Sequence, residues 1–133
     1  MLAVGIIGGA GYTGAELLRL LAMHDQVDVK IITSREYAGI AVGQVHGHLA
    51  GYYQQTFVYP DENLFKNLDL LFFATPHGVS MNLVPALLEQ NVRVIDLSAD
   101  YRLRDSELWK KWYGGVHTSE NLLNKAVYGL PEL

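Results

Sequence analysis

The sequence predicts an α/β domain of the doubly wound, Rossmann type, built on a mostly parallel β-sheet. Short apolar segments alternate with segments of helical periodicity along the chain, which is typical of βαβ units with right-handed crossovers. A cluster of glycines at residues 8–14 joins the first apolar segment directly to the first helical one. These observations predict the strand order 3-2-1-4-5, with ligands bound at the carboxyl ends of the strands, where the order reverses.

Five segments have the composition of strands. Residues 1–7 and 68–74 are mostly apolar runs, as expected for central strands with both faces buried. Residues 27–33 are rich in β-branched side chains, and residues 92–97 form the last strand. Residues 56–59 are predicted to form a short strand at the edge of the sheet.

Three segments have helical patterns. The first follows the glycines, and its apolar face consists of Gly14, Leu17, Leu18 and Leu21. The second covers residues 79–88 and contains Pro85, so it is kinked or begins late. The third begins at a cap formed by Asp105 or Ser106 and is predicted to bury a stripe made of Leu108, Trp109, Trp112 and Tyr113. Residues 34–55 have a glycine at every fourth position from residue 39 and are predicted to form a loop with one helical turn.

Length and composition bound the class of protein. Half of the 133 residues are hydrophobic and 18% are charged, so the chain can bury a sizeable core. Ten basic and 14 acidic residues give a formal net charge of −4, which argues against a nucleic-acid partner. The sequence has no cysteine, no signal-peptide pattern, and no apolar run near the ~20 residues that span a bilayer. We therefore expect one cytoplasmic domain over residues 1–133 that makes no contact with a membrane.

The glycine cluster is the strongest functional motif. Gly8, Gly11 and Gly14 have G-x-x-G-x-x-G spacing, and the same cluster can be read as G-x-G-x-x-G from Gly9. Glycines at such a turn let a pyrophosphate approach the N–H groups at the positive end of a helix. The turn lies between the first strand and the first helix, which is where a dinucleotide-binding fingerprint must lie. The alternative is a tight turn that binds nothing; we interpret the cluster as a pyrophosphate-binding loop.

The end of the second strand predicts which dinucleotide is bound. An acidic residue there would hold the ribose 2′-hydroxyl of NAD, but this chain has Ser34 and Arg35. A hydroxyl followed by a guanidinium suits a 2′-phosphate, because arginine presents a planar fork of donors. The pattern favours NADP over NAD. Two alternatives stay open: Arg35 is an ordinary surface residue, or Glu36 is the acid that binds NAD.

Further candidates follow the fourth and fifth predicted strands, opposite the glycine loop. Ala74, Thr75 and Pro76 are expected to line the path from adenosine to nicotinamide, and His77 either acts as an acid or base or fills a hydrogen-bonding position. Ser98, Asp100 and Arg102 add polar groups to the same rim. Asp100 and Arg102 are most simply a structural ion pair, with Arg102 as an anion ligand as the alternative.

A metal site is not predicted. His46 and His48 are two residues apart, but neighbouring glycines favour a loop and no third ligand accompanies them, whereas a catalytic zinc site needs about three protein ligands.

Five strings occur in order between residue 11 and residue 133: GYTGAELLRLL, TSREYAG, ATPHGVSM, VIDLSADYRL and VYGLPEL. Together they resemble the N-terminal part of the N-acetyl-γ-glutamyl-phosphate reductases, a branch of the semialdehyde dehydrogenase family. The resemblance implies reduction of N-acetyl-L-glutamyl 5-phosphate by NADPH to N-acetyl-L-glutamate 5-semialdehyde and phosphate, a step of arginine biosynthesis. It implies that the cofactor-binding residues are Gly8, Gly11, Tyr12, Thr13, Gly14, Ser34, Arg35, Ala74, Thr75, Pro76 and Ser98. Arg102 is the candidate for the substrate phosphate.

The resemblance also implies that catalysis needs residues outside this sequence. In such enzymes a cysteine thiolate attacks the acyl phosphate, and hydride then reduces the thioester. The motif that carries this cysteine follows the Y-G-L-P-E segment, whereas this sequence contains no cysteine up to Leu133. The substrate-binding domain, the histidine that assists the thiol and most subunit contacts of a homo-oligomer are expected beyond it too. We therefore expect the chain to bind NADP(H) and, by itself, to catalyse no reduction of acyl phosphate.

Three other interpretations stay open. A related enzyme of lysine biosynthesis, which acts on a carrier-protein-linked substrate, is similar over this region. The string DLSADYRL disfavours the more distant aspartate-semialdehyde dehydrogenases. A dinucleotide-binding module without catalysis, and a scaffold with an empty turn, are the alternatives from other functional classes.

Overall fold

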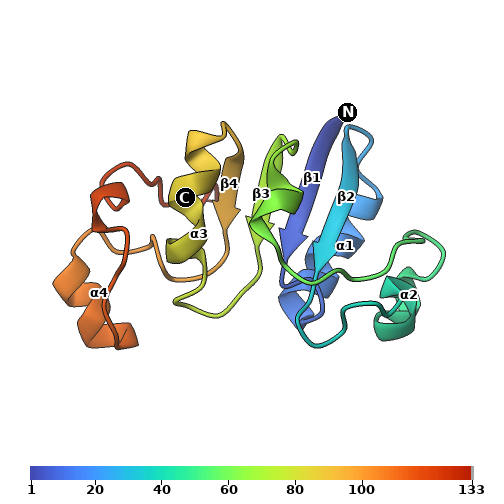
Figure 1. Cartoon of the computed structure of the whole chain (residues 1–133), viewed down its shortest axis with the longest axis horizontal. Helices are drawn as coiled ribbons and strands as arrows, with labels where there is room; N and C mark the ends of the chain where they lie inside the picture. The colour runs from blue at the N-terminus through green and yellow to red at the C-terminus, as the bar shows by residue number, and fades with distance from the viewer. Residues whose placement is uncertain (133) are drawn as a thin grey trace.

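A computed structural model describes residues 1–132 of the chain (Figure 1). Its sheet has four parallel strands, β1 (Leu2–Ile7), β2 (Val27–Thr33), β3 (Leu70–Phe73) and β4 (Arg93–Asp96). Their order across the sheet is β2-β1-β3-β4, so the chain crosses from one half of the sheet to the other between β2 and β3. The predicted doubly wound α/β fold is confirmed, and its switch point lies between β1 and β3.

The predicted edge strand at residues 56–59 is not a full strand. It contributes one parallel bridge, between Val58 and Thr33 at the end of β2. The Val58 N–H donates to the Ile32 carbonyl, and the Val58 carbonyl accepts from the Ser34 N–H, both at 3.0 Å. Pro60 has no N–H and therefore cannot extend this ladder. The segment occupies the expected edge position beside β2, but the prediction of a continuous strand is wrong.

Besides the strands, residues 1–132 form four α-helices and three short 3₁₀ turns. The α-helices are α1 (Tyr12–Ala22), α2 (Val42–Val45), α3 (Ser80–Glu89) and α4 (Ser106–Tyr113). The 3₁₀ turns are η1 (Gly47–Leu49), η2 (Glu62–Phe65) and η3 (Glu120–Leu122). None of the helices in the described part of the chain is long and apolar enough to cross a membrane.

Two apolar cores lie on the two faces of the sheet. One packs α1 and the segment at residues 41–57 against β1 and β2, and its buried members include Ile6, Leu18, Ile32 and Phe57. The other packs α3 against β3, and its buried members include Leu71, Phe73, Val84 and Leu87. Helices thus cover both faces of the sheet. Because the four strands are parallel, their carboxyl ends lie along the same edge.

The segment between β2 and β3 is more ordered than a loop. It contains α2 and η1, and two side chains fix it to the first half of the sheet. The Tyr53 hydroxyl donates to the Leu18 carbonyl of α1 at 2.6 Å, and the Gln55 amide donates to the Val29 carbonyl of β2 at 2.8 Å. Burial raises the pKa of Tyr53 to about 12, because the phenolate would lose its hydration there.

Helix α3 runs from Ser80 to Glu89 with Pro85 inside it, so the late start offered as one alternative from the sequence is wrong. A proline at residue 85 cannot donate to the Met81 carbonyl four residues earlier. The Ser119 hydroxyl donates to that carbonyl instead, at 3.0 Å. The segment after α4 therefore supplies the hydrogen bond that the helix itself lacks.

Helix α4 stands apart from the sheet (Figure 1). Its cap is Asp105, whose carboxylate accepts from the N–H groups of Glu107 and Leu108 at 2.9 and 3.2 Å. Trp109 is buried and donates from its ring N–H to the Ala99 carbonyl at 3.1 Å. Leu108 is 40% exposed and Trp112 is 70% exposed, so the predicted buried stripe is wrong at these two residues. The reason is that α4 buries only the side that carries Trp109.

Candidate functional site

Two glycines shape the turn between β1 and α1. Gly8 has a φ of +84°, and a Cβ added there would lie 2.6 Å from the Ala74 carbonyl oxygen. A Cβ on Gly14 would lie 2.7 Å from backbone atoms of Gly9. The first glycine thus lets the turn approach the end of β3, and the second lets α1 pack closely on the turn. Any side chain at either position would push these backbone segments apart.

Gly11 differs from these two glycines. Its backbone is extended, with φ −79° and ψ −179°, and a Cβ added there would have no atom within 4 Å. Packing therefore does not require a glycine at this position. It is the N-cap of α1, and it leaves open space at the positive end of that helix.

The backbone N–H groups of the turn fall into two sets. Those of Gly8 and Gly9 donate to the hydroxyl and carbonyl oxygens of Thr33, at 3.4 and 2.9 Å. The five N–H groups of residues 10–14 have no acceptor among residues 1–132, and no side chain caps α1. The Tyr12 side chain is 98% exposed and does not cover them. The turn therefore presents a row of unpaired donors that suits an anion.

The end of β2 is adjacent to the turn through the two bonds to Thr33. Ser34 is buried, and its hydroxyl accepts from the Tyr37 N–H at 3.1 Å. Arg35 is exposed; its guanidinium donates to the Tyr59 hydroxyl at 2.5 Å and lies over that ring, 5.2 Å from the centroid. The structure thus brings the two predicted 2′-phosphate residues beside the turn, with Ser34 bonded to its own loop and Arg35 held by Tyr59.

The end of β3 lies on the other side of the turn. Besides its contact with the Ala74 carbonyl, a Cβ on Gly8 would lie 3.1 Å from the Thr75 methyl group. The hydroxyl oxygen of Thr75 is buried and has no hydrogen-bond partner among the described residues. A buried hydroxyl without a partner costs about 1–3 kcal/mol, so this oxygen indicates a polar group of a ligand at the switch point. The exposed Pro76 follows on the same loop.

The predicted ion pair between Asp100 and Arg102 is wrong. The Asp100 carboxylate is fully buried and accepts from the N–H groups of Gly78 at 2.7 Å and Met81 at 3.0 Å. It also accepts from the Ser80 hydroxyl at 3.0 Å. Arg102 instead donates to the Tyr113 hydroxyl, with its two bonds at 2.7 and 3.1 Å. The loop after β4 folds back over the start of α3, where a carboxylate meets unpaired N–H groups and the positive end of the helix.

A sequence signal for this role of Asp100 exists. The residue before α3 is Val79, which has no side-chain oxygen with which to cap the helix. The N–H groups of the first turn must then bond to water or to an acceptor from elsewhere in the chain. The sequence places Asp96 at the end of the next strand and Asp100 four residues later, and both are candidates for this role.

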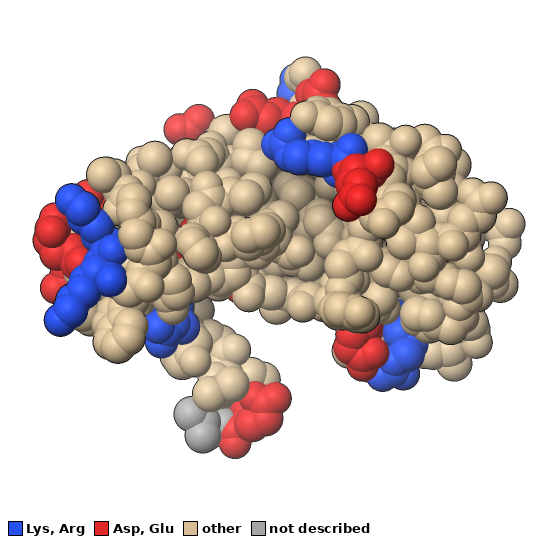
Figure 2. Space-filling model, turned by 90° about the horizontal axis from the view of Figure 1, so that it is seen from below, with Lys and Arg blue, Asp and Glu red and all other residues tan. Residues whose placement is uncertain are grey.

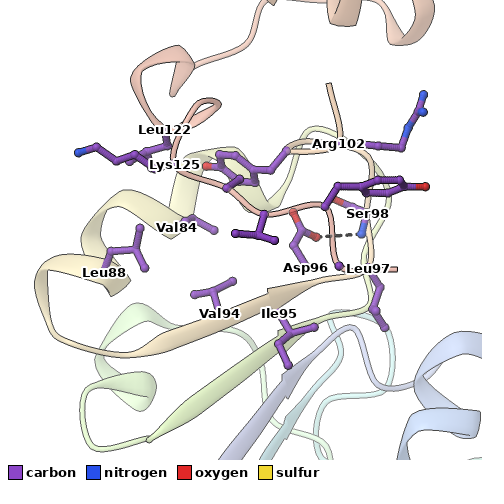
Figure 3. A pocket seen from close by; sticks show the side chains of 15 residues that line it. Val84, Leu88, Val94, Ile95, Asp96, Leu97, Ser98, Arg102, Leu122 and Lys125 are labelled. Carbon is purple, nitrogen blue, oxygen red and sulfur yellow. Dashed lines mark hydrogen bonds between the residues drawn. The ribbon is translucent and has the colours of Figure 1, made fainter. Parts of the chain in front are cut away.

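Ser98 and Arg102 lie at an apolar groove of about 760 Å³ between α3, β4 and the segment at residues 122–129 (Figure 3). Val84 and Leu88 of α3 point toward Val94 of β4 across its floor. The Ser98 N–H donates to the Asp96 carboxylate at 2.8 Å. No residue of the glycine turn lines this groove. Ser98 and Arg102 thus share a groove that begins at the carboxyl end of β4.

His77 and His46 both contact other groups of the protein. The His77 ring is exposed and lies against the rings of Tyr113 and Trp109, with centroids 5.6 and 6.4 Å away. His46 is buried and contacts the glycine turn, with its Nε2 2.8 Å from the Gly9 carbonyl oxygen. Within the described part of the chain, no group of three or more His, Asp or Glu side chains could hold a metal ion.

The carboxyl ends of the strands face the viewer in Figure 2. Uncharged residues make up most of this face, and the Lys, Arg, Asp and Glu side chains lie in small separate groups, one of which, a basic group beside an acidic one, lies inside its outline. An anion at this edge would therefore bind to backbone N–H groups more than to a cluster of cationic side chains.

Comparison with known proteins gives a consistent result. A family model described as semialdehyde dehydrogenase, NAD binding domain, matches residues 3–133. The chain is 52% identical over 133 residues to the N-acetyl-gamma-glutamyl-phosphate reductase of Cellvibrio japonicus and 54% identical over 134 residues to that of Azotobacter vinelandii. Both alignments cover all of this chain but only 38% and 39% of those proteins.

Solved structures show the same fold at low sequence identity. The aspartate semialdehyde dehydrogenase of Candida albicans, determined with NADP, has a TM-score of 0.66 and 16% identity over 80% of this chain and 32% of its own. The aspartate semialdehyde dehydrogenase II of Vibrio cholerae has a TM-score of 0.59 and 20% identity over 76% of this chain and 32% of its own.

Proposed function

Because the chain belongs to the family of semialdehyde dehydrogenase NAD-binding domains, we propose that it is the NADPH-binding domain of an N-acetyl-γ-glutamyl-phosphate reductase. The whole enzyme would reduce N-acetyl-L-glutamyl 5-phosphate to N-acetyl-L-glutamate 5-semialdehyde and phosphate. Relatives at 52–54% identity over the whole chain carry this name, which supports the reaction. The chain spans 38–39% of their length, so other parts of the enzyme would hold the substrate.

One observation carries the cofactor assignment: the row of unpaired N–H groups at residues 10–14, open to solvent over Gly11. Two phosphate groups of a dinucleotide supply the acceptors that these donors lack. The buried, unpartnered hydroxyl of Thr75 lies across the turn and adds one polar contact for the same ligand. Unpaired donors and an unpaired hydroxyl at one switch point fit a dinucleotide better than an empty turn.

The cofactor, once bound, supplies a hydride to the substrate carbonyl carbon. The chain's own residues bind and orient it: residues 8–14 hold the pyrophosphate, and Ser34 and Arg35 hold the 2′-phosphate. Ala74, Thr75, Pro76 and Ser98 form the wall on the nicotinamide side. Arg102 is exposed at the groove beyond β4 and is the candidate for the phosphate of the substrate.

The nucleophile lies outside this chain, which contains no cysteine. The 133-residue chain alone is therefore expected to bind NADPH and to give no acyl-phosphate reduction. In the complete enzyme we expect a cytoplasmic homo-oligomer.

Thermal unfolding with and without cofactor tests the proposed function. A ligand that binds only the native state raises the melting temperature, and a concentration 100 times its Kd stabilises the native state by about 2.7 kcal/mol. NADPH is expected to raise the melting temperature of the chain in a concentration-dependent way. If neither NADPH nor NADH shifts it, the turn is a structural feature and the proposal fails.

Arg35→Ala tests the preference for NADPH. The substitution removes a charge-assisted hydrogen bond to the 2′-phosphate, so binding of NADPH is expected to weaken by about 1.5–3 kcal/mol. Binding of NADH, which has no 2′-phosphate, should change little. Isothermal titration with both cofactors measures this difference. Arg19→Ala, which removes an exposed pair between Arg19 and Glu16 on α1, is the matched control and should alter neither affinity. Equal losses for NADPH and NADH in Arg35→Ala would contradict the assignment.

A further inference from the structure

We propose that His46 is a positioning residue that sets the orientation of the pyrophosphate-binding turn. Its Nε2 lies 2.8 Å from the carbonyl oxygen of Gly9, although 37 residues separate the two. A carbonyl oxygen only accepts, so Nε2 carries the proton and donates it. The inference rests on the proposed function, because it assigns His46 a role in cofactor binding.

The peptide bond between Gly9 and Ala10 transmits this contact to the turn. The peptide group is planar and trans, so its carbonyl and its N–H point in opposite directions. A donor that holds the Gly9 carbonyl therefore fixes the direction of the Ala10 N–H, which points away from His46. This N–H is the first of the five that have no acceptor among the described residues. Because Gly9 is a glycine, its own side chain cannot restrict this rotation.

His46 is itself held firmly enough to serve as an anchor. Its N–H donates to the Val42 carbonyl at 2.8 Å, and its carbonyl accepts from the Leu49 N–H at 2.9 Å. The ring is buried and packs edge-on against Phe57, whose side chain is also fully buried. The ring of His48 lies on another side, with the two centroids 6.2 Å apart. The segment around His46 is fixed to α1 and β2 by Tyr53 and Gln55.

Gly9 is held from two sides, by the end of β2 and by the segment that contains α2. On the β2 side, Thr33 holds the N–H groups of Gly8 and Gly9. On the α2 side, His46 holds the Gly9 carbonyl. Gly9 is thus bonded at both its N–H and its carbonyl before any ligand arrives. Fixing the donors in advance reduces the conformational entropy that cofactor binding would otherwise cost.

Three variants of the complete polypeptide encoded by the gene test this role: His46→Phe, His46→Gln and Asp105→Ala. Phenylalanine fills the buried site without a donor, whereas glutamine places an amide N–H at a similar reach. Asp105→Ala is the control for a loss of stability, because Asp105 caps α4 and contacts neither the turn nor the segment that holds His46. The two probes are NADPH and adenosine 2′-monophosphate, which has the 2′-phosphate but no pyrophosphate.

His46→Phe is expected to raise the Kd for NADPH about five- to tenfold, the effect of losing one hydrogen bond. The Kd for adenosine 2′-monophosphate should stay unchanged, and His46→Gln should restore most of the NADPH affinity. Asp105→Ala should lower the melting temperature and leave both affinities unchanged. A role confined to stability would weaken both ligands alike in His46→Phe and would overturn the proposal. An NADPH affinity of His46→Phe equal to that of the unsubstituted protein would overturn it too.

A measurement on the unsubstituted protein covers the case in which His46→Phe does not fold. The Nε2 proton of His46 should give a slowly exchanging NMR signal that shifts when NADPH binds and stays in place with adenosine 2′-monophosphate. Absence of that signal, or no shift with bound NADPH, contradicts the role of His46. If the unsubstituted protein binds no NADPH at all, the proposed function fails instead, and the two outcomes are distinct.

Discussion

Gly11→Asp is expected to remove most of the NADPH affinity while leaving the free chain as stable as before, or more stable. Gly11 has backbone angles open to any residue, and a Cβ there meets no atom within 4 Å. Aspartate is among the preferred N-cap residues, so its carboxylate should cap α1. The same carboxylate would stand where the pyrophosphate must lie. Two unit charges 4 Å apart repel by about 1 kcal/mol in water and about 4 kcal/mol near a protein surface, so we expect a roughly 100-fold rise in Kd.

Gly11→Asn is the control for this experiment. Asparagine caps a helix about as well as aspartate but has no charge. Isothermal titration with NADPH, together with urea unfolding of the free chain, should show a much smaller loss of affinity for Gly11→Asn and similar stability for both variants. Equal affinity losses would mean that bulk rather than charge excludes the cofactor. Unchanged affinity in both variants would falsify the assignment of residues 10–14 as the pyrophosphate site.

Asp100→Ala is expected to lower the free energy of unfolding by about 3–5 kcal/mol. The substitution leaves the N–H groups of Gly78 and Met81 without an acceptor in a buried place, and each such loss costs about 1–3 kcal/mol. The Ser80 hydroxyl keeps a bond to Asp96, so it adds little to the loss. Because the affected backbone leads from the end of β3 into α3, the wall at Thr75 should loosen too, and NADPH affinity should fall.

Asp105→Ala provides the comparison for Asp100→Ala. Asp105 also caps a helix, α4, but it is exposed, and water replaces its carboxylate when it is removed. Urea unfolding should show a loss of about 1 kcal/mol for this variant. If both substitutions lower the free energy of unfolding equally, the burial of Asp100 does not determine how much its carboxylate stabilises the fold.

Short-range sequence patterns correctly predicted three strands and the turn between the first strand and the first helix. The apolar runs at β1, β2 and β3 and the glycines at residues 8–14 specify strands and a strand–helix turn through their own sequence. The order of the strands followed from the connection between βαβ units, and it is confirmed even though the edge segment at Val58 forms only one bridge.

The contacts that the sequence did not predict join residues far apart in the chain. Asp100 was assigned to Arg102 two residues away, whereas its partners lie 19 to 22 residues earlier. His46 lies in a glycine-rich segment whose composition predicts a loop, yet tertiary packing orders it against the turn. Trp112 has the right spacing for a buried face, but α4 packs on one side only. Periodicity shows which residues share a face and does not show what covers that face.

The hydrogen bond from Ser119 to the Met81 carbonyl has a practical consequence for dissecting this protein into smaller pieces. Cutting the chain after α4 would keep every strand and every α-helix. It would nevertheless leave a carbonyl in the first turn of α3 without its donor and remove Leu122 from the core beside Val84. A minimal unit that still folds must therefore extend at least through Leu123, ten residues past the last α-helix, although nothing in its regular secondary structure marks that limit.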